Sequence, residues 1–231
     1  MSFELERIEA LLFDVDGTLS DTDDHMIARL VKFLRPVRWG FKDKDVRPFA
    51  RWAIMAAETP GNFLYALPDR FGFDIHLASL SDWFAHRRHT RRDPGDLFLL
   101  IDGVKEMLYA LHLHYPMAIV SARNEPSTLM FLNHFALDHF FQVVITSHTC
   151  KHTKPFPDPI WYAAESLDVP VEACLMIGDT SVDVHAALAA GAQSLSVLCG
   201  FGTEGELRRA GTHHVLNTTA QVKDLLLSPG I

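Results

Sequence analysis

The chain contains 231 residues, of which 48% are hydrophobic, and its formal net charge is −8. This length and composition are typical of an ordinary globular protein that buries a sizeable core, either as one domain with an insertion or as a large and a small domain. We find no secretory signal and no apolar segment long enough to cross a membrane, so we expect a cytoplasmic protein with no membrane and no nucleic-acid partner.

Five short apolar runs predict the strands of a sheet, and they lie at 9–14, 117–122, 142–147, 173–178 and 193–198. Runs this short and this continuously apolar are typical of strands that are buried on both faces, as in a parallel sheet. Between them, apolar residues recur at helical spacing from Val104, Ile160 and Val184 onward. The alternation of strands and helices predicts a doubly wound α/β fold with a parallel sheet.

The stretch 22–96 interrupts this alternation directly after the first predicted strand. It has no comparable apolar run, and its aromatic and basic residues stand at mostly helical spacing, which predicts three or four helices. Residues 25–95 contain 13 Lys and Arg against 7 Asp and Glu, a charge of +6, whereas the remainder of the chain carries −14. We therefore predict a core formed by 1–21 and 97–231, with an inserted basic helical domain at 22–96.

Chemically active side chains follow the predicted strands where each one ends. They are Asp14 and Asp16 after the first strand, Ser121 at the end of the second, Lys154 in a turn after the third, and Asp179 and Asp183 after the fourth. Ligands bind at the carboxyl ends of strands in open parallel sheets, so we expect these groups to meet at one edge. Neighbouring carboxylates repel one another unless solvent or a cation offsets their charge, and Mg²⁺ prefers oxygen ligands.

Each motif has a plainer interpretation when it is taken alone. The DVDG segment at 14–17 could be a turn with solvated carboxylates, and GDTSVD at 178–183 could be the capped start of a helix. Ser121 could simply be a hydroxyl at the end of a strand. Lys151 competes with Lys154, although the Lys-Pro-x-Pro context favours Lys154.

Together, these segments resemble the four ordered motifs of the haloacid dehalogenase (HAD) superfamily. The matching segments are Asp14-x-Asp16-Gly17-Thr18, Ser121, Lys154-Pro155 and Gly178-Asp179-x-x-x-Asp183, within a resemblance that spans 10–203. The segments GDTSVDVHAALAAG and GFGT are most similar to the branch that contains phosphoglycolate phosphatases, and the insertion resembles the helical cap of that subtype. The resemblance implies an α/β HAD-like Rossmannoid core, a doubly wound parallel sheet, with an inserted all-helical cap domain.

The resemblance also implies a role for each motif residue in an Mg²⁺-dependent phosphatase. Asp14 would be the nucleophile that forms an aspartyl-phosphate, and Asp16 would protonate the leaving alcohol and later activate water. The metal ligands would be drawn from Asp14, the Val15 carbonyl, Asp16, Asp179 and Asp183, with Asp183 acting through a metal-bound water or by orienting Lys154. The phosphate-binding and substrate-binding residues would be Gly17, Thr18, Ser121, Ala122, Arg123 and Lys154.

Several alternatives remain open at this stage. Asp16 argues against a dehalogenase, because a halide leaving group needs no proton, and favours phosphoryl transfer to water. A phosphomutase of the β-phosphoglucomutase type would use the same intermediate, and a non-enzymatic protein could bind an acidic partner through the basic cap. Arg123 departs from the small or amide residues common after the second motif, and it could contact substrate or face solvent. We expect a small phosphorylated metabolite as substrate and a monomer or homodimer.

Overall fold

The computed structural model describes residues 3–21 and 98–228, and every structural statement below refers to these two ranges. The predicted helical cap at 22–96 lies outside the described residues, so the division of the chain into core and cap stays a prediction.

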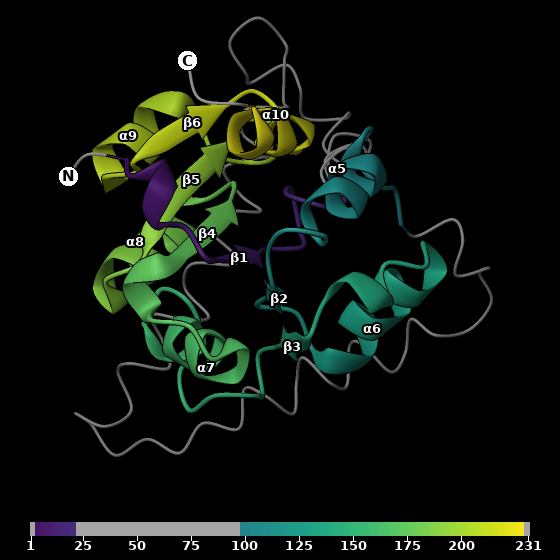
Figure 1. The fold of residues 1–231 in the computed structure, drawn as a ribbon. Coiled ribbons are helices and arrows are strands. Elements are labelled where there is room, and N and C mark those ends of the chain that lie inside the picture. Colours follow the sequence, from purple (N-terminus) through teal and green to yellow (C-terminus); the bar gives the residue numbers. More distant parts are fainter. Residues whose placement is uncertain (1–2, 22–97, 229–231) are drawn as a thin grey trace, which may run out of the picture.

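A six-stranded sheet forms the centre of the structure, in the order β3-β2-β1-β4-β5-β6 (Figure 1). All neighbouring strands are parallel. The strands are β1 (Ala10–Phe13), β2 (Met117–Val120), β3 (Val143–Ile145), β4 (Cys174–Gly178), β5 (Gln193–Val197) and β6 (His214–Leu216). The first five coincide with the predicted runs. The sixth was not predicted, because it is a short, half-buried edge strand without an apolar run.

Helices cover both faces of the sheet, which confirms the doubly wound α/β prediction for the core (Figure 1). On one face lie α5 (Val104–Leu111), α6 (Glu125–His134) and α10 (Val222–Leu227). On the other lie α7 (Asp158–Leu167) and α8 (Ser181–Ala190), and α9 (Glu204–Ala210) contacts α8. Successive side chains of a strand point to opposite faces, so Leu11 and Phe13 pack in the first layer and Ala10 and Leu12 in the second.

The strand order places a topological switch point beside β1. From β1 the chain adds β2 and β3 on one side, and then it crosses back to place β4 on the other side of β1. The loops that follow β1 and β4 therefore leave the sheet next to each other, which is where ligands bind in folds of this kind. The two loops begin with Asp14 and Asp179.

Cys150, Cys174 and Cys199 form no disulfide in the structure. No helix within the described ranges has both the length and the apolar character that a membrane span requires.

Candidate active site

The loop after β1 is a tight turn that places Asp14 at the end of the sheet. The Asp14 N–H donates to the Ile177 carbonyl of β4 at 3.0 Å, so the main chain of Asp14 continues the pairing of the two strands. Gly17 has a φ of 75°, a left-handed conformation that suits glycine, and its N–H donates to the Ser20 carbonyl at 2.9 Å. The chain thereby reverses within a few residues, and the Asp14 side chain stays almost fully buried.

The same turn contradicts the expectation that the Val15 carbonyl binds the metal. The Val15 carbonyl accepts hydrogen bonds from the N–H groups of Leu19 at 2.9 Å and of Ser20 at 2.8 Å. A carbonyl oxygen has two lone pairs, and the turn uses both. The Val15 carbonyl is therefore not available as a metal ligand in this conformation.

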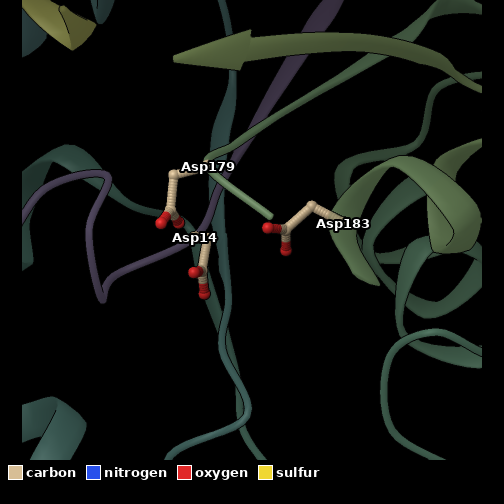
Figure 2. Close-up of side chains that lie close together, drawn as sticks. All are labelled: Asp14, Asp179 and Asp183. Carbon is tan, nitrogen blue, oxygen red and sulfur yellow. The ribbon is translucent and has the colours of Figure 1, made fainter. Parts of the chain in front are cut away.

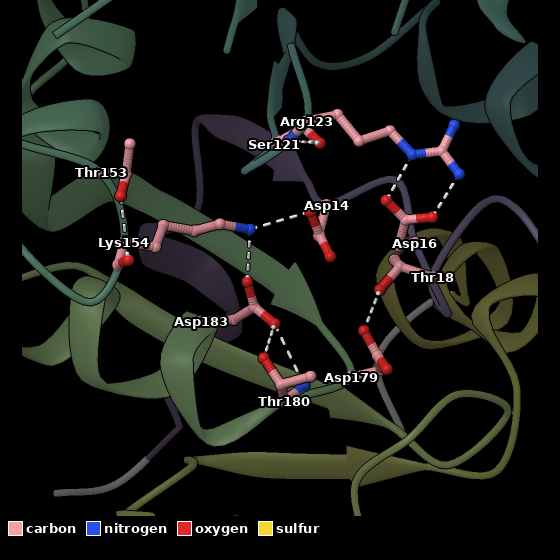
Figure 3. Close-up of polar contacts among 10 residues, drawn as sticks. All are labelled: Asp14, Asp16, Thr18, Ser121, Arg123, Thr153, Lys154, Asp179, Thr180 and Asp183. Atoms are coloured by element: carbon pink, nitrogen blue, oxygen red, sulfur yellow. Dashed lines mark hydrogen bonds and ion pairs between the residues drawn. The ribbon is translucent and has the colours of Figure 1, made fainter. Parts of the chain in front are cut away.

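Lys154 joins carboxylates from two different strand ends. Its Nζ donates to Asp14 Oδ1 at 2.8 Å and to Asp183 Oδ1 at 2.6 Å, and the lysine is only 3% exposed (Figure 3). Burial by itself lowers the pKa of Lys154, but the charges of Asp14 and Asp183 outweigh burial and the net pKa is raised. The ammonium is thus a permanent positive charge beside Asp14, whereas the competing candidate Lys151 is exposed.

Asp183 is itself held by the start of α8. Its Oδ2 accepts hydrogen bonds from the Thr180 N–H at 3.1 Å and from the Thr180 hydroxyl at 2.7 Å. An acid in the first turn is favoured there by the helix dipole and by the unpaired N–H groups. The plainer interpretation of this segment as a helix cap is correct for Oδ2, while Oδ1 of the same carboxylate orients Lys154.

The Asp179 carboxylate accepts hydrogen bonds from the loops that follow β1 and β5. Its Oδ1 accepts from the Thr18 hydroxyl at 3.2 Å, and its Oδ2 accepts from the Phe201 N–H at 2.8 Å. A Cβ built on Gly17 or on Gly200 would lie 2.2 Å or 2.1 Å, respectively, from Asp179 Oδ2. Only glycine therefore allows the two loops to approach this carboxylate.

Thr18 does not take the place that the motif resemblance implied for it. The residue is completely buried, its hydroxyl donates to Asp179, and its carbonyl accepts from the Thr219 hydroxyl at 2.6 Å. Because the turn after β1 folds the Thr18 side chain inward, this residue orients Asp179 and has no surface for a substrate.

Three carboxylates converge at the switch point, as the sequence predicted. Asp14, Asp179 and Asp183 each offer an oxygen atom, and these atoms lie within 4.8 Å of one another (Figure 2). All three residues are buried, and together they supply the hard oxygen donors that Mg²⁺ prefers. The donor set of these three carboxylates fits a divalent cation.

The electrostatic surroundings of Asp14 explain why a cation suits this site. The pKa of Asp14 is raised to about 7, mainly by burial and also by the charges of Asp183 and Asp16, against the opposing effect of Lys154. One ammonium therefore does not fully offset the buried carboxylates. A divalent cation would supply the missing positive charge and would favour the ionised, nucleophilic form of Asp14.

Ser121 and Arg123 approach from the end of β2. Ser121 is buried, its N–H donates to the Ile145 carbonyl at 2.9 Å, and its hydroxyl accepts from the Arg123 N–H at 3.2 Å. Ala122, between them, is exposed at the edge of the sheet. Arg123 forms an ion pair with Asp16, in which Nε and Nη2 donate to the two oxygens of that carboxylate (Figure 3).

Asp16 thus differs from the other acids of the predicted site. Its carboxylate faces Arg123, and the carboxylate cluster that could hold a metal comprises Asp14, Asp179 and Asp183 within the described residues. The side chain of Asp16 is 24% exposed, against 11% for Asp14. The Asp16 carboxylate therefore lies outside the cluster that could hold a metal in this conformation.

Comparison with known proteins agrees with this arrangement. The family model of haloacid dehalogenase-like hydrolases matches residues 11–197, which include every strand from β1 to β5 except Ala10. The chain belongs to this family. The prediction of a HAD hydrolase is thereby confirmed.

Two curated relatives and one solved structure show how far the similarity extends. A protein from Listeria innocua named pyrophosphatase PpaX is 33% identical over 78% of each chain. A protein from Colwellia psychrerythraea named phosphoglycolate phosphatase is 26% identical over 97% of this chain and 98% of its own. The crystal structure of a predicted phosphatase from Clostridium acetobutylicum has a TM-score of 0.67 at 22% identity, with 96% of this chain and 99% of that chain covered. This structure supports the HAD fold.

Sequence reasoning missed three positioning residues of this HAD site, namely Thr180, Gly200 and Phe201. Thr180 directs Asp183 and Phe201 directs Asp179, while Gly200 leaves the space that the Asp179 carboxylate occupies. A signal for the second pair was present, because the glycine-containing segment GFGT follows a buried strand and so lies at the same edge of the sheet. Thr180 carried the signal of a helix N-cap residue followed by an acid three positions later.

Proposed function

We propose that this HAD hydrolase is an Mg²⁺-dependent phosphatase that hydrolyses the monoester of a small phosphorylated metabolite through an aspartyl-phosphate on Asp14. The observation that carries the proposal is the double contact of Lys154 with Asp14 and Asp183, beside Asp179. The buried Lys154 ammonium can bind an oxygen of a phosphoryl group. The same ammonium orients the Asp14 carboxylate, which can then attack phosphorus as the nucleophile. The names of the two curated relatives, a pyrophosphatase and a phosphoglycolate phosphatase, support phosphate chemistry.

In the first half of the reaction, an Asp14 carboxylate oxygen attacks phosphorus and the phosphorus–oxygen bond to the alcohol breaks. Lys154 and the Ser121 hydroxyl would stabilise the charge on the transferring phosphoryl oxygens, and Asp16 would donate its proton to the departing alkoxide. The products of this half are a free alcohol and the aspartyl-phosphate. A bound Mg²⁺ ion, held by Asp14 and Asp179, would supply charge neutralisation between the nucleophile and the phosphate.

In the second half, Asp16 takes a proton from water while the water oxygen attacks phosphorus. The bond between phosphorus and the Asp14 oxygen breaks, which restores the Asp14 carboxylate and releases inorganic phosphate. Each turnover thus consumes one ester and one water and returns every residue to its starting protonation state. A phosphomutase would instead return the phosphoryl group to a sugar hydroxyl and would release little free phosphate.

The test combines a substrate screen with trapping of the intermediate. A panel of phosphorylated metabolites is incubated with the purified protein and MgCl₂, and released phosphate is measured with and without EDTA. We expect turnover that requires Mg²⁺ and is abolished in Asp14→Asn, and an acid-stable, hydroxylamine-labile label on the wild-type protein after quenching with ³²P-labelled ester. An isomerised sugar phosphate without phosphate release would establish the mutase, and undiminished turnover by Asp14→Asn would contradict the proposal.

A further inference from the structure

The ion pair between Arg123 and Asp16 is the most exposed of the ion pairs in the candidate site. The side chains of Arg123 and Asp16 are 15% and 24% exposed, whereas those of Lys154 and Asp183 are 4% and 2% exposed. The guanidinium fork faces both carboxylate oxygens of Asp16, which is the geometry in which arginine recognises a carboxylate or a phosphate most specifically. The pair joins residues 107 positions apart in the sequence.

Arg123 is held in place independently of Asp16. Its carbonyl accepts from the Ser147 N–H at 2.9 Å, and its N–H donates to the Ser121 hydroxyl at 3.2 Å. Its Cζ lies 5.5 Å from the centre of the Phe98 ring and 6.0 Å from that of Phe131, so two aromatic rings contribute to the surroundings of the cation. These contacts leave the guanidinium positioned even when its anionic partner changes.

The pair also engages both oxygens of the Asp16 carboxylate. They accept from Arg123, whereas Asp14 accepts from Lys154 (Figure 3). To pass a proton to an ester oxygen beside Asp14, Asp16 has to leave the guanidinium and take up a proton from solvent, because the ion-paired carboxylate carries none. Leaving the guanidinium costs free energy, because an ion pair between two partly buried groups is broken.

We propose that Arg123 binds a second anionic group of the substrate, a carboxylate or a second phosphate, which replaces Asp16 and releases it to serve as general acid and base. This inference rests on the proposed phosphatase function and specifies its substrate class. An ester with an anionic tail exchanges one ion pair for another, so Arg123 keeps a counter-ion throughout. An ester with a neutral tail separates Asp16 from Arg123 without replacement, and a cationic tail is repelled.

Three two-carbon phosphate esters test the exchange, because they differ mainly in the charge of the tail. They are 2-phosphoglycolate with a carboxylate, ethyl phosphate with a methyl group, and phosphoethanolamine with an ammonium; pyrophosphate serves as the compound whose second group is a phosphate. We expect kcat/KM for 2-phosphoglycolate or for pyrophosphate, or for both, to exceed that for ethyl phosphate by at least about tenfold, and phosphoethanolamine to be the poorest substrate. Which of the two anionic compounds is preferred identifies the second anion.

The variants Arg123→Gln and Arg123→Lys separate this role from a purely positioning one. The measured quantity is kcat/KM for the preferred anionic compound divided by kcat/KM for ethyl phosphate. If Arg123 binds the tail, Arg123→Gln lowers this ratio by at least about tenfold. Arg123→Lys keeps the charge but loses the guanidinium fork, so its ratio should lie between those of Arg123→Gln and the wild type. If Arg123 only orients Asp16, all esters slow by the same factor and the ratio is unchanged, which would overturn the proposal. The control Arg209→Gln removes the same charge from an exposed position on α9 and should leave the ratio unchanged.

A binding measurement tests the Arg123 site independently of the proposed phosphatase activity. Calorimetric titration of Asp14→Asn with the anionic compounds and with ethyl phosphate should show tighter binding of an anionic one, and the added Arg123→Gln substitution should remove this preference. Preferential binding without hydrolysis by the wild type would refute the phosphatase and retain the Arg123 site. Hydrolysis with equal binding of anionic and neutral esters would refute the Arg123 site and retain the phosphatase.

Discussion

The Lys154 ammonium lies 2.6 Å from Asp183 Oδ1, and the other oxygen of Asp183 accepts from Thr180 at the start of α8. The helix terminus therefore determines where the lysine can place its charge. Lys154 also pairs with Asp14, because β1 and β4 are neighbours in the sheet and their ends lie side by side. This chain of contacts connects the packing of the fold to the reactivity of one carboxylate.

Lys154→Met should lower kcat by about 100-fold or more, because removal of a donor to the transferring phosphoryl group costs about that much in comparable sites. Methionine is similar in length and apolar, so it fills the space of the lysine stem. Lys151→Met is the matched control, since Lys151 is exposed and lies in the same loop, and it should retain wild-type kcat. Steady-state phosphate release for both variants decides whether the sequence context identified the right lysine.

Thr180→Ala should weaken the start of α8 without removing the charge of Asp183. The substitution deletes the hydroxyl that donates to Asp183 Oδ2, and we expect the free energy of unfolding to fall by about 1 kcal/mol, as for other N-cap substitutions. Denaturant unfolding monitored by circular dichroism measures this loss. A change in stability below the error of the measurement would show that the Thr180 hydroxyl contributes nothing to the cap.

Asp183→Asn, unlike Thr180→Ala, should lower activity and leave stability nearly unchanged. Asparagine still accepts hydrogen bonds from Thr180, so the helix start is preserved, but Lys154 loses one of its two carboxylates. We expect kcat to fall by at least about tenfold while the midpoint of thermal unfolding changes little. Equal kcat in Asp183→Asn and the wild type would contradict the role of Asp183 in orienting Lys154.

Gly200→Ala should disturb Asp179 and therefore the use of Mg²⁺. The added Cβ would lie 2.1 Å from Asp179 Oδ2 and 2.6 Å from the Gly17 carbonyl, so the carboxylate or the loop has to move. We expect the MgCl₂ concentration for half-maximal activity to rise several-fold. In the control Gly205→Ala the nearest atom to the new Cβ is 4.0 Å away, and alanine favours the helical conformation of α9, so magnesium dependence should not change.

Protonation of His213 should lower the free energy of unfolding as the pH falls below about 6.5. Burial is the main cause that lowers the pKa of His213, and its Nδ1 accepts from the Ser194 N–H at 3.0 Å, which requires an unprotonated Nδ1. The unfolded chain therefore binds a proton on this side chain at a higher pH than the folded chain does. The stability that the neutral imidazole contributes is present above the unfolded pKa and is lost as the pH falls through the window between the two pKa values.

The comparison of wild type with His213→Asn isolates this effect from the other histidines, because asparagine can offer an oxygen to the same N–H but does not titrate. Urea unfolding at pH 7.5, 6.5 and 5.5 should show a smaller loss of stability in the variant than in the wild type. Parallel pH profiles for the two proteins would show that His213 is not responsible.

The sequence by itself determined the local parts of this protein. Short apolar runs predicted five of the strands, and the residues that follow them, Asp14, Ser121, Lys154, Asp179 and Asp183, do lie at the predicted edge of the sheet. These predictions succeed because a buried strand and a helix each have a characteristic spacing of apolar side chains, and because parallel strands all end at the same edge.

Only the tertiary structure decided how these residues are paired. The sequence left Arg123 open between substrate and solvent, and it placed Asp16 among the metal ligands, whereas the fold joins the two in a partly exposed ion pair. It likewise turned Thr18 and the Val15 carbonyl inward. The physical reason is that the partner of a side chain depends on strand order and on the path of loops that lie far apart in the sequence, and no local spacing of residues encodes either.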